Sequence, residues 1–184
     1  MFILYAVVIG LVVGALAGGR PAGIGHVQFR WGWLIFLGFA TQVLLFSAPV
    51  AERIGALGPP IYVASTAVVL VALIRNVAQP GLPIVAVGAL CNFAAIVANG
   101  GYMPASTDAL AALGRLPAGG YSNSAVLAAP ALAPLTDVFA LPAGLPFANV
   151  FSVGDVLIGV GVALAIAVAM RPVRRGTSPV GAMD

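Results

Sequence analysis

The stretch NVFSVGDVLIGVGVALAIAVAMR, residues 149–171, decides the fold class of this chain. Between Val153 and Met170 it contains one charged residue, Asp155, and it ends at Arg171. A helix crosses the hydrocarbon core of a bilayer with about 20 apolar residues, in a range of about 17 to 25. The length of this apolar run and the polar residues at its ends therefore predict a transmembrane helix.

Four other apolar segments end at a polar residue, a glycine or a proline. They cover residues 2–17, 31–50, 59–74 and 82–98. Of the 184 residues, 61% are hydrophobic and 7% are charged, whereas a soluble domain has about 25% charged residues. With the segment 153–170, we predict one membrane domain over residues 1–184. Its expected fold is all-α, an integral membrane bundle of five transmembrane helices.

The arginines predict the orientation of this bundle. The chain has no lysine, a bias typical of GC-rich bacterial genomes. If five spans alternate, Arg53 and Arg115 fall on one side, and the other side holds Arg20, Arg30, Arg75, Arg171, Arg174 and Arg175. Cytoplasmic loops are enriched in arginine and lysine. We therefore expect a bacterial plasma membrane protein with its N-terminus outside and a cytoplasmic tail, residues 171–184. The scattered arginines do not indicate a partner nucleic acid.

Small and polar residues inside the predicted spans indicate how the helices pack. Small residues recur at every fourth position: Gly10, Gly14 and Gly18 in the first span, and Gly159, Ala163 and Ala167 in the fifth. Such faces allow close helix approach, either within the bundle or in a homodimer. Gln42 and Asn92 lie within apolar spans, so we expect both amides to face the interior, as structural hydrogen bonds or along a ligand or ion path.

Residues 99–149 form an unusually long outer connection between the fourth and fifth spans. Its six prolines exclude one continuous helix. Two short helical pieces are expected, one from Ser106 as N-cap to Leu113 and one from near Asn123 to before Pro130. The segment is too apolar for a solvated loop, so we predict an outer-face cap across the helix ends, with any site beneath it.

Two acidic residues flank the end of this cap. Asp137 lies within it, and Asp155 lies in the first turn of the fifth span. Two carboxylates that meet at a poorly hydrated interface cannot both ionise easily, and such a pair can act as general acid and base. The alternative for Asp155 is a capping box with Ser152, and for Asp137 a structural role in a turn.

The stretch NGGYMP, residues 99–104, is the second candidate site. Gly100 can end the fourth helix in a left-handed conformation. The backbone at Asn99, Gly100, Gly101 and Tyr102 could also approach an anion or another ligand closely. One histidine and one cysteine give no zinc site, and no nucleotide-binding or haem motif is present. We therefore predict no metal and no cofactor.

Two resemblances add to these interpretations. With its NGGYMP, LPF and NVFSVGDVLIGVG stretches, nearly the whole chain resembles a bacterial five-span membrane family classed as a domain of unknown function, which implies no activity. Residues 135–163 are similar to the C-terminal part of lipoprotein signal peptidase (signal peptidase II), a membrane aspartyl protease. That resemblance implies a catalytic pair of Asp137 and Asp155, with Asn149 as the motif's asparagine. Asn149 lies six positions before Asp155, where the motif has three.

Three functions fit these observations. The first is a non-catalytic subunit, or a module that binds a ligand or lipid, within a larger membrane complex. The second is an aspartyl-type membrane hydrolase that uses Asp137 and Asp155. The third is a small transporter component, which the absence of an inverted repeat and of a charge in the middle of a span disfavours. Expected partners are membrane lipids and other membrane subunits or a second copy of the chain.

The predicted topology can be tested with single cysteines in a Cys91→Ser background. A cysteine introduced near Gly119 should react with a membrane-impermeant thiol reagent on intact cells, because the cap is expected outside. A cysteine introduced just after Arg171 should react only after the cells are opened. Reaction at both positions in intact cells would place them on the same side of the membrane and contradict the five-span topology.

Overall fold

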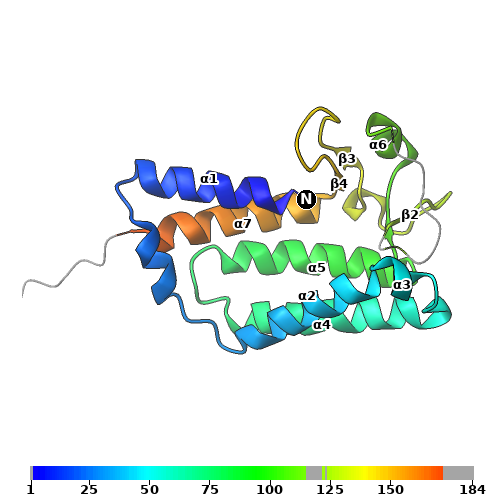
Figure 1. The fold of residues 1–184 in the computed structure, drawn as a ribbon, viewed down its shortest axis with the longest axis horizontal. Coiled ribbons are helices and arrows are strands. Elements are labelled where there is room, and N and C mark those ends of the chain that lie inside the picture. The colour runs from blue at the N-terminus through cyan, green and yellow to red at the C-terminus, as the bar shows by residue number, and fades with distance from the viewer. Residues whose placement is uncertain (1, 115–121, 123, 172–184) are drawn as a thin grey trace, which may run out of the picture.

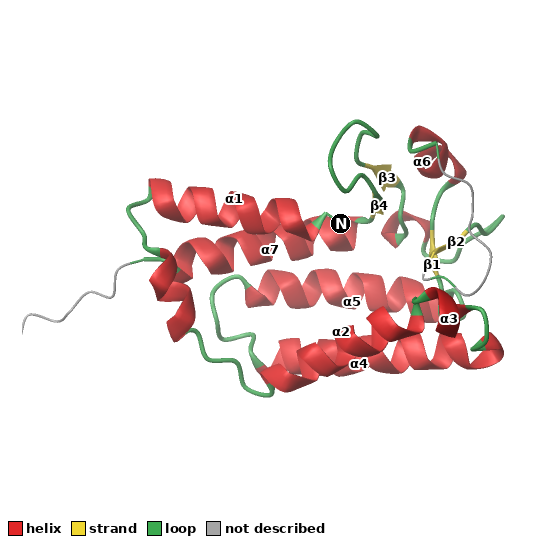
Figure 2. Cartoon of the chain, in the orientation of Figure 1, coloured by secondary structure: helices red, strands yellow, loops and turns green. Residues whose placement is uncertain are grey.

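The computed structural model of this chain describes residues 2–114, 122 and 124–171, and these residues are mostly helical (Figures 1 and 2). The α-helices are α1 (Ile3–Leu16), α2 (Gly32–Leu45), α3 (Ala48–Ala51), α4 (Gly58–Arg75), α5 (Leu82–Ala98), α6 (Thr107–Ala112) and α7 (Val153–Ala169). The 3-10 helices are η1 (Pro21–His26), η2 (Gly55–Leu57) and η3 (Ala133–Leu135). The strands are β1 (Met103–Pro104), β2 (Ser124–Ala125), β3 (Phe139–Ala140) and β4 (Val150–Phe151). The tail expected at residues 171–184 lies outside the described residues beyond Arg171.

The five long helices, α1, α2, α4, α5 and α7, fall on the five apolar segments of the sequence. One expected boundary is wrong, because the segment 31–50 is not a single helix. Helix α2 ends at Leu45, and α3 begins at Ala48. Pro49 has no N–H to continue the helix, and its ring would collide with the carbonyl four residues earlier. The Ser47 hydroxyl donates to the Leu44 carbonyl at 2.6 Å at this break.

The order in which the helices pack differs from their order in the chain. Helix α7 packs against both α1 and α5, α5 packs against α4, and α4 packs against α2. The last helix therefore lies between the first and the fourth long helix, as Figure 1 shows. In the described part of the chain, α1 and α2 follow one another in sequence but do not form a closely packed pair.

Glycines bring α7 close to both of its neighbours. A Cβ atom on Gly88 of α5 would lie 2.4 Å from the Gly154 carbonyl oxygen, and one on Gly10 of α1 would lie 2.9 Å from the Ala163 backbone. The small residues predicted to allow close approach therefore pack inside the bundle. Gly18 is different, since a Cβ there meets nothing within 4 Å.

The residues between α5 and α7 gather at one end of the bundle, as the cap was predicted to do (Figure 1). Strand β1 pairs in parallel with β2, and β3 pairs in antiparallel with β4. Ser106 caps α6, accepting from the Ala109 N–H at 3.0 Å, which confirms the first helical piece. The second piece is wrong at Ser124–Ala125, because this segment is extended and the Ala125 carbonyl accepts from the Ala105 N–H. Asn123 lies outside the described residues.

The start of α1 is attached to the cap. The Tyr5 hydroxyl donates to the Pro146 carbonyl at 2.6 Å. The Phe2 ring stacks on Phe151 of β4 at a centroid distance of 4.7 Å, and Phe139 of β3 stacks on the same ring at 5.4 Å. These contacts fix where α1 begins relative to the cap.

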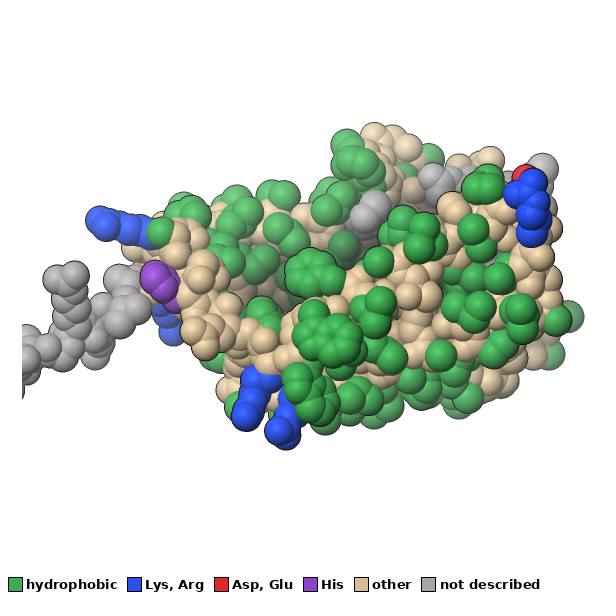
Figure 3. Space-filling view, turned by 60° about the horizontal axis from the view of Figure 1, so that its bottom comes forward, with side chains coloured by type: hydrophobic (Ala, Val, Ile, Leu, Met, Phe, Trp, Pro, Cys, Tyr) green, Lys and Arg blue, Asp and Glu red, His purple; other side chains and the backbone are tan. Residues whose placement is uncertain are grey.

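Large apolar side chains cover the outside of the helices (Figure 3). Leu16 is 84% exposed, Phe36 78% and Val43 73%. In the described part of the chain, the segment Gly55–Arg75 is long and apolar enough to cross a membrane. Helices α1, α2, α5 and α7 are also apolar but shorter, with 14 to 17 residues each. Most of the basic side chains seen in Figure 3 gather at the end of the molecule opposite the cap.

The close approach of α5 and α7 predicts that Gly88→Ala destabilises the fold. The added Cβ would push against backbone that cannot move aside, and overpacking of this kind costs about 1–3 kcal/mol. Thermal unfolding in detergent should show the loss. Gly25→Ala is the matched control, because a Cβ at Gly25 meets nothing within 4 Å. Equal melting temperatures for the two variants would contradict the close approach.

Candidate functional site

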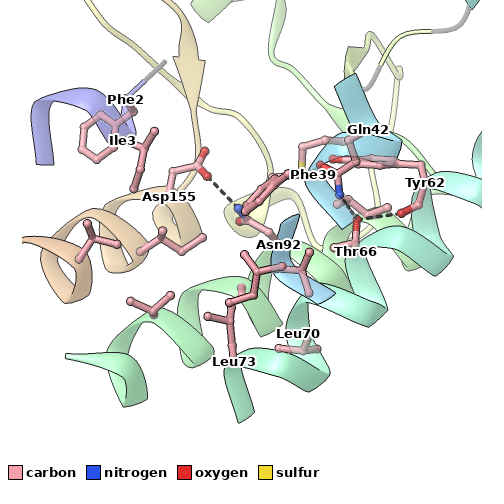
Figure 4. Close-up of a pocket in the computed structure, with 18 of the residues that line it drawn as sticks. Phe2, Ile3, Phe39, Gln42, Tyr62, Thr66, Leu70, Leu73, Asn92 and Asp155 are labelled. Carbon is pink, nitrogen blue, oxygen red and sulfur yellow. Dashed lines mark hydrogen bonds between the residues drawn. The ribbon is translucent and has the colours of Figure 1, made fainter. Parts of the chain in front are cut away.

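A cavity of about 540 Å³ lies between the helices, beneath the cap (Figure 4). All five long helices contribute to its wall, and Met103, Asp137, Asn149 and Val150 contribute from the cap. Its volume is in the range of small-molecule sites, about 300–1,000 Å³. The cavity exists because α1 and α2 do not pack closely on each other in the described structure, so the other helices do not close the bundle.

The polar residues of the wall lie toward the cap. Gln42 is on the last turn of α2, Thr66 is in the middle of α4, and Asp155 is in the first turn of α7. The other polar residues of the wall are Tyr62, Asn92, Asp137 and Asn149. Because these helices alternate in direction, their cap ends coincide and the polar groups share one end of the cavity.

The opposite end of the cavity is apolar. It is lined by Phe29 before α2, by Leu70 and Leu73 late in α4, and by Leu82 at the start of α5. Leu82 and Asn92 lie ten residues apart on α5, which is about 15 Å of helix rise. The wall therefore changes from polar to apolar over a length close to half the thickness of a bilayer core.

Asp155 is held by three groups at the polar end. Its Oδ1 accepts from Asn92 Nδ2 at 2.9 Å, and its Oδ2 accepts from the Ser152 N–H at 3.0 Å. Ser152 Oγ accepts from the Asp155 N–H and donates to Asn92 Oδ1 at 2.8 Å. The predicted capping box of Ser152 and Asp155 is thus confirmed. Asn92, predicted to face the interior, links this capping box to α5.

Gln42 forms the second polar link across helices. Its Nε2 lies 3.3 Å from Thr66 Oγ1 and 3.4 Å from Ser65 Oγ. The Thr66 hydroxyl donates in turn to the Tyr62 carbonyl at 2.8 Å, as Figure 4 shows. The amide therefore satisfies its donor within the bundle, as expected of a polar side chain in an apolar helix.

Asp137 is the more deeply buried of the two acidic residues in this wall. Its residue is 6% exposed and lines the cavity. Its backbone is fixed, because the Asp137 N–H donates to Pro104 and its carbonyl accepts from the Ser106 N–H. Its carboxyl oxygens accept none of the hydrogen bonds found among the described residues, and since no enclosed side-chain oxygen there lacks a partner, they open onto the cavity. Burial, and secondarily the charge of Asp155, raises the pKa of Asp137 from 3.8 to about 7.

The candidates of the NGGY stretch do not line the cavity. Asn99 holds the cap to α5: its Nδ2 donates to the Ala95 and Ala131 carbonyls, and its Oδ1 accepts from the Ala131 N–H at 2.8 Å. Gly100 and Gly101 have φ values of 69° and 89°, which confirms the left-handed helix end. A Cβ on Gly101 would collide with Pro59. Tyr102 follows this turn, and Asn149 lines the cavity with Asp137 and Asp155.

Several wall residues carried no signal in the sequence. Phe2 and Phe39 lie in apolar runs, and Phe29 lies in the polar loop before α2, so only the packing order selects these three rings. Phe29 is 45% exposed and Phe39 54%, so both rings also reach the outer surface of the bundle. The cavity therefore opens beside α2. Among residues 2–114, 122 and 124–171, no group of three or more His, Cys, Asp or Glu residues could hold a metal ion.

The raised pKa of Asp137 predicts a pH dependence of stability. Because the folded pKa lies above the unfolded one, the folded state binds more protons between about pH 4 and pH 7. The contribution of Asp137 to the free energy of unfolding is fully present below about pH 4 and is lost as the pH rises to about 7. Compared with the Asp137→Asn variant, the native chain should lose a few kcal/mol of unfolding free energy over this range, since a shift of one pKa unit corresponds to about 1.4 kcal/mol. Thermal unfolding of both in detergent across this range checks the difference, and parallel curves would contradict the burial of an ionisable Asp137.

Comparison with curated proteins and with solved structures gives no match. The profile of one protein family does match, over residues 26–167. This range runs from the end of η1 through α2, α4, α5, the cap and most of α7, so it includes the polar end of the cavity. By this match, the chain belongs to a family described as a family of unknown function (DUF5317).

Proposed function

We propose that the chain is a five-span protein of a bacterial plasma membrane that binds a single-chain, lipid-like amphiphile in the cavity beneath its cap. It acts as a non-catalytic membrane component, alone or within a larger complex. The bilayer is its solvent because its helices leave large apolar side chains such as Leu16, Phe36 and Val43 mostly exposed. A protein in water rarely exposes large contiguous apolar patches.

The lengths of the helices fit this environment. The long helices have 14–18 residues, or about 21–27 Å of helix rise. This is somewhat less than the hydrocarbon core of about 30 Å. Local thinning of the bilayer and apolar residues beyond the helix ends accommodate such a difference at modest cost.

Charge supports the orientation. Arg20 binds the end of α7 through its backbone N–H, and the Arg75 guanidinium lies 5.4 Å from the Trp31 ring centre. These groups, with Arg30 and Arg171, belong to the end of the bundle away from the cap. By the positive-inside rule this end is cytoplasmic. The cap and the start of α1 then lie outside.

The ligand class is inferred from the cavity wall, which is polar at the cap end and apolar at the other end. An amphiphile would place its polar group beside Asn92, Asp137 and Asp155 and extend its chain toward Leu73 and Leu82. The outer polar end would lie near the headgroups, and the apolar end would lie within the membrane. Phe29 and Phe39 form the side of the cavity open to lipid, so such a ligand could enter laterally.

A second candidate is an aspartyl-type hydrolase that acts on the same class of molecule. One observation favours it: Asp137 and Asp155 line one cavity, and the charge of Asp155 contributes to the raised pKa of Asp137. A carboxyl group that is partly protonated near neutral pH beside a carboxylate is the condition for general acid–base catalysis. The engagement of both Asp155 oxygens in the capping network favours the binding function instead.

The binding function can be tested with hexadecanol and protein in detergent micelles, read by native mass spectrometry. We expect saturable binding of one molecule per chain. Val162→Phe should abolish it, because Val162 lines the cavity. Val160→Phe on the same helix should bind normally, because Val160 is 53% exposed.

Two outcomes would change the assignment. Binding that is equal in both variants would place hexadecanol on the outer surface and contradict the proposal. Cleavage of a bound hexadecyl ester by the native chain, lost in Asp137→Asn and in Asp155→Asn, would favour the hydrolase.

A further inference from the structure

We propose that the polar end of the cavity is a binding site for a protonated amine, so that the ligand is a cationic single-chain amphiphile. This inference rests on the proposed binding function and specifies the headgroup. It starts from the chemical groups that the cavity presents at its cap end.

The first observation is that the only charged side chains of the described wall are acidic. Asp137 and Asp155 supply four carboxyl oxygens, and Asn92 uses its Nδ2 on Asp155 and its Oδ1 on Ser152. The residues that form the described wall include no arginine, lysine or histidine. An anionic headgroup would meet like charge here, whereas an ammonium group carries up to three donors and no acceptor.

The second observation is the state of Asp137. It is one of the most buried polar residues in the described chain, at 6% exposure, and it faces the cavity. Its carboxyl oxygens receive no hydrogen bond from the described residues, in contrast to those of Asp155. No fully enclosed side-chain oxygen of the described residues lacks a partner, so the Asp137 oxygens open onto the cavity. A donor on a ligand in the cavity could therefore bond them.

The surroundings of Asp155 suit a cation as well. The Phe2 ring lines the cavity and lies beside Asp155 in Figure 4, on the side away from Asn92. Aromatic faces attract ammonium groups, most strongly where water is excluded. Phe2 is held in place by its stacking on Phe151. The carboxylates and the ring together provide complementary charge on two sides.

The apolar part of the cavity distinguishes an amphiphilic amine from a bare cation. A metal ion needs several oxygen ligands and would use only the cap end of the wall. It would leave unfilled the length lined by Leu70, Leu73, Leu82 and Val85. An alkyl chain attached to the amine fills this length and gains from leaving water.

The experiment compares three probes with the same chain: hexadecylamine, hexadecanol and palmitate, each titrated into the protein in detergent. Hexadecylamine should bind at least about tenfold more tightly than hexadecanol, since a hydrogen bond to a charged group is worth at least that ratio. Palmitate should bind more weakly than hexadecanol, because its carboxylate would face Asp155.

Asp137→Asn should remove most of the advantage of the amine and leave hexadecanol binding nearly unchanged. Asp108→Asn is the control, because Asp108 is an exposed residue of α6 and does not line the cavity. Thermal unfolding of each variant confirms that it is folded. Val162→Phe should block all three probes.

Three other outcomes would contradict one of the two proposals. Equal affinity for the amine and the alcohol, both blocked by Val162→Phe, would overturn the charge assignment and leave the proposed binding function intact. An amine advantage that persists in Asp137→Asn would also overturn it. Failure of all three probes to bind would contradict the binding function itself.

Discussion

The hydrogen bonds of Asn92 hold the rest of the site in place. This amide lies on α5, and it bonds both the carboxylate of Asp155 and the hydroxyl of Ser152 at the start of α7. The contact is possible because Gly88 and Gly154 let the two helices approach until their backbones touch. One side chain thus joins the last helix to the fourth long one and holds the two side chains, Ser152 and Asp155, that bond the free N–H groups at the start of α7.

The position of α7 also creates the cavity. Because α7 fills the space between α1 and α5, the wall formed by α1, α7, α5, α4 and α2 is an open curve, and its two ends are the neighbours in sequence, α1 and α2. A bundle in which α1 packed on α2 would have used the same apolar side chains to fill its centre. The order of packing, more than the identity of any one lining residue, therefore makes the difference between a solid core and an open cavity.

The sequence predicts the parts of this fold that depend on local chemistry. Apolar length locates the helices, Ser106 and Ser152 mark helix starts, and Gly100 marks an end. Pro49 was a local signal for the break after α2, but the apolar run hid it. The extended backbone at Ser124–Ala125 depends on pairing with the strand Met103–Pro104, which no local pattern specifies.

The site was predictable only in part, for the same reason. An interior position was predictable for Asn92, because an amide inside an apolar run requires a partner. Asp137 and Asp155 were predictable as candidates, because carboxylates are rare in this chain. The cavity that joins them depends on which helices pack together, and apolar periodicity alone does not encode that order. Asn99 shows the reverse case, in which a polar residue at a conspicuous turn binds the cap backbone at Ala131 and lies away from the cavity.

The bond between Tyr5 and Pro146 has a mechanical consequence. Helix α1 forms one edge of the opening beside α2, and its first turn is tied to the cap by this bond and by the stacking of Phe2 on Phe151. A sideways tilt of α1 that widened the opening would either break these contacts or draw the β3–β4 hairpin along with it. The opening beside α2 and the β3–β4 hairpin are therefore mechanically coupled, and a movement of one would move the other.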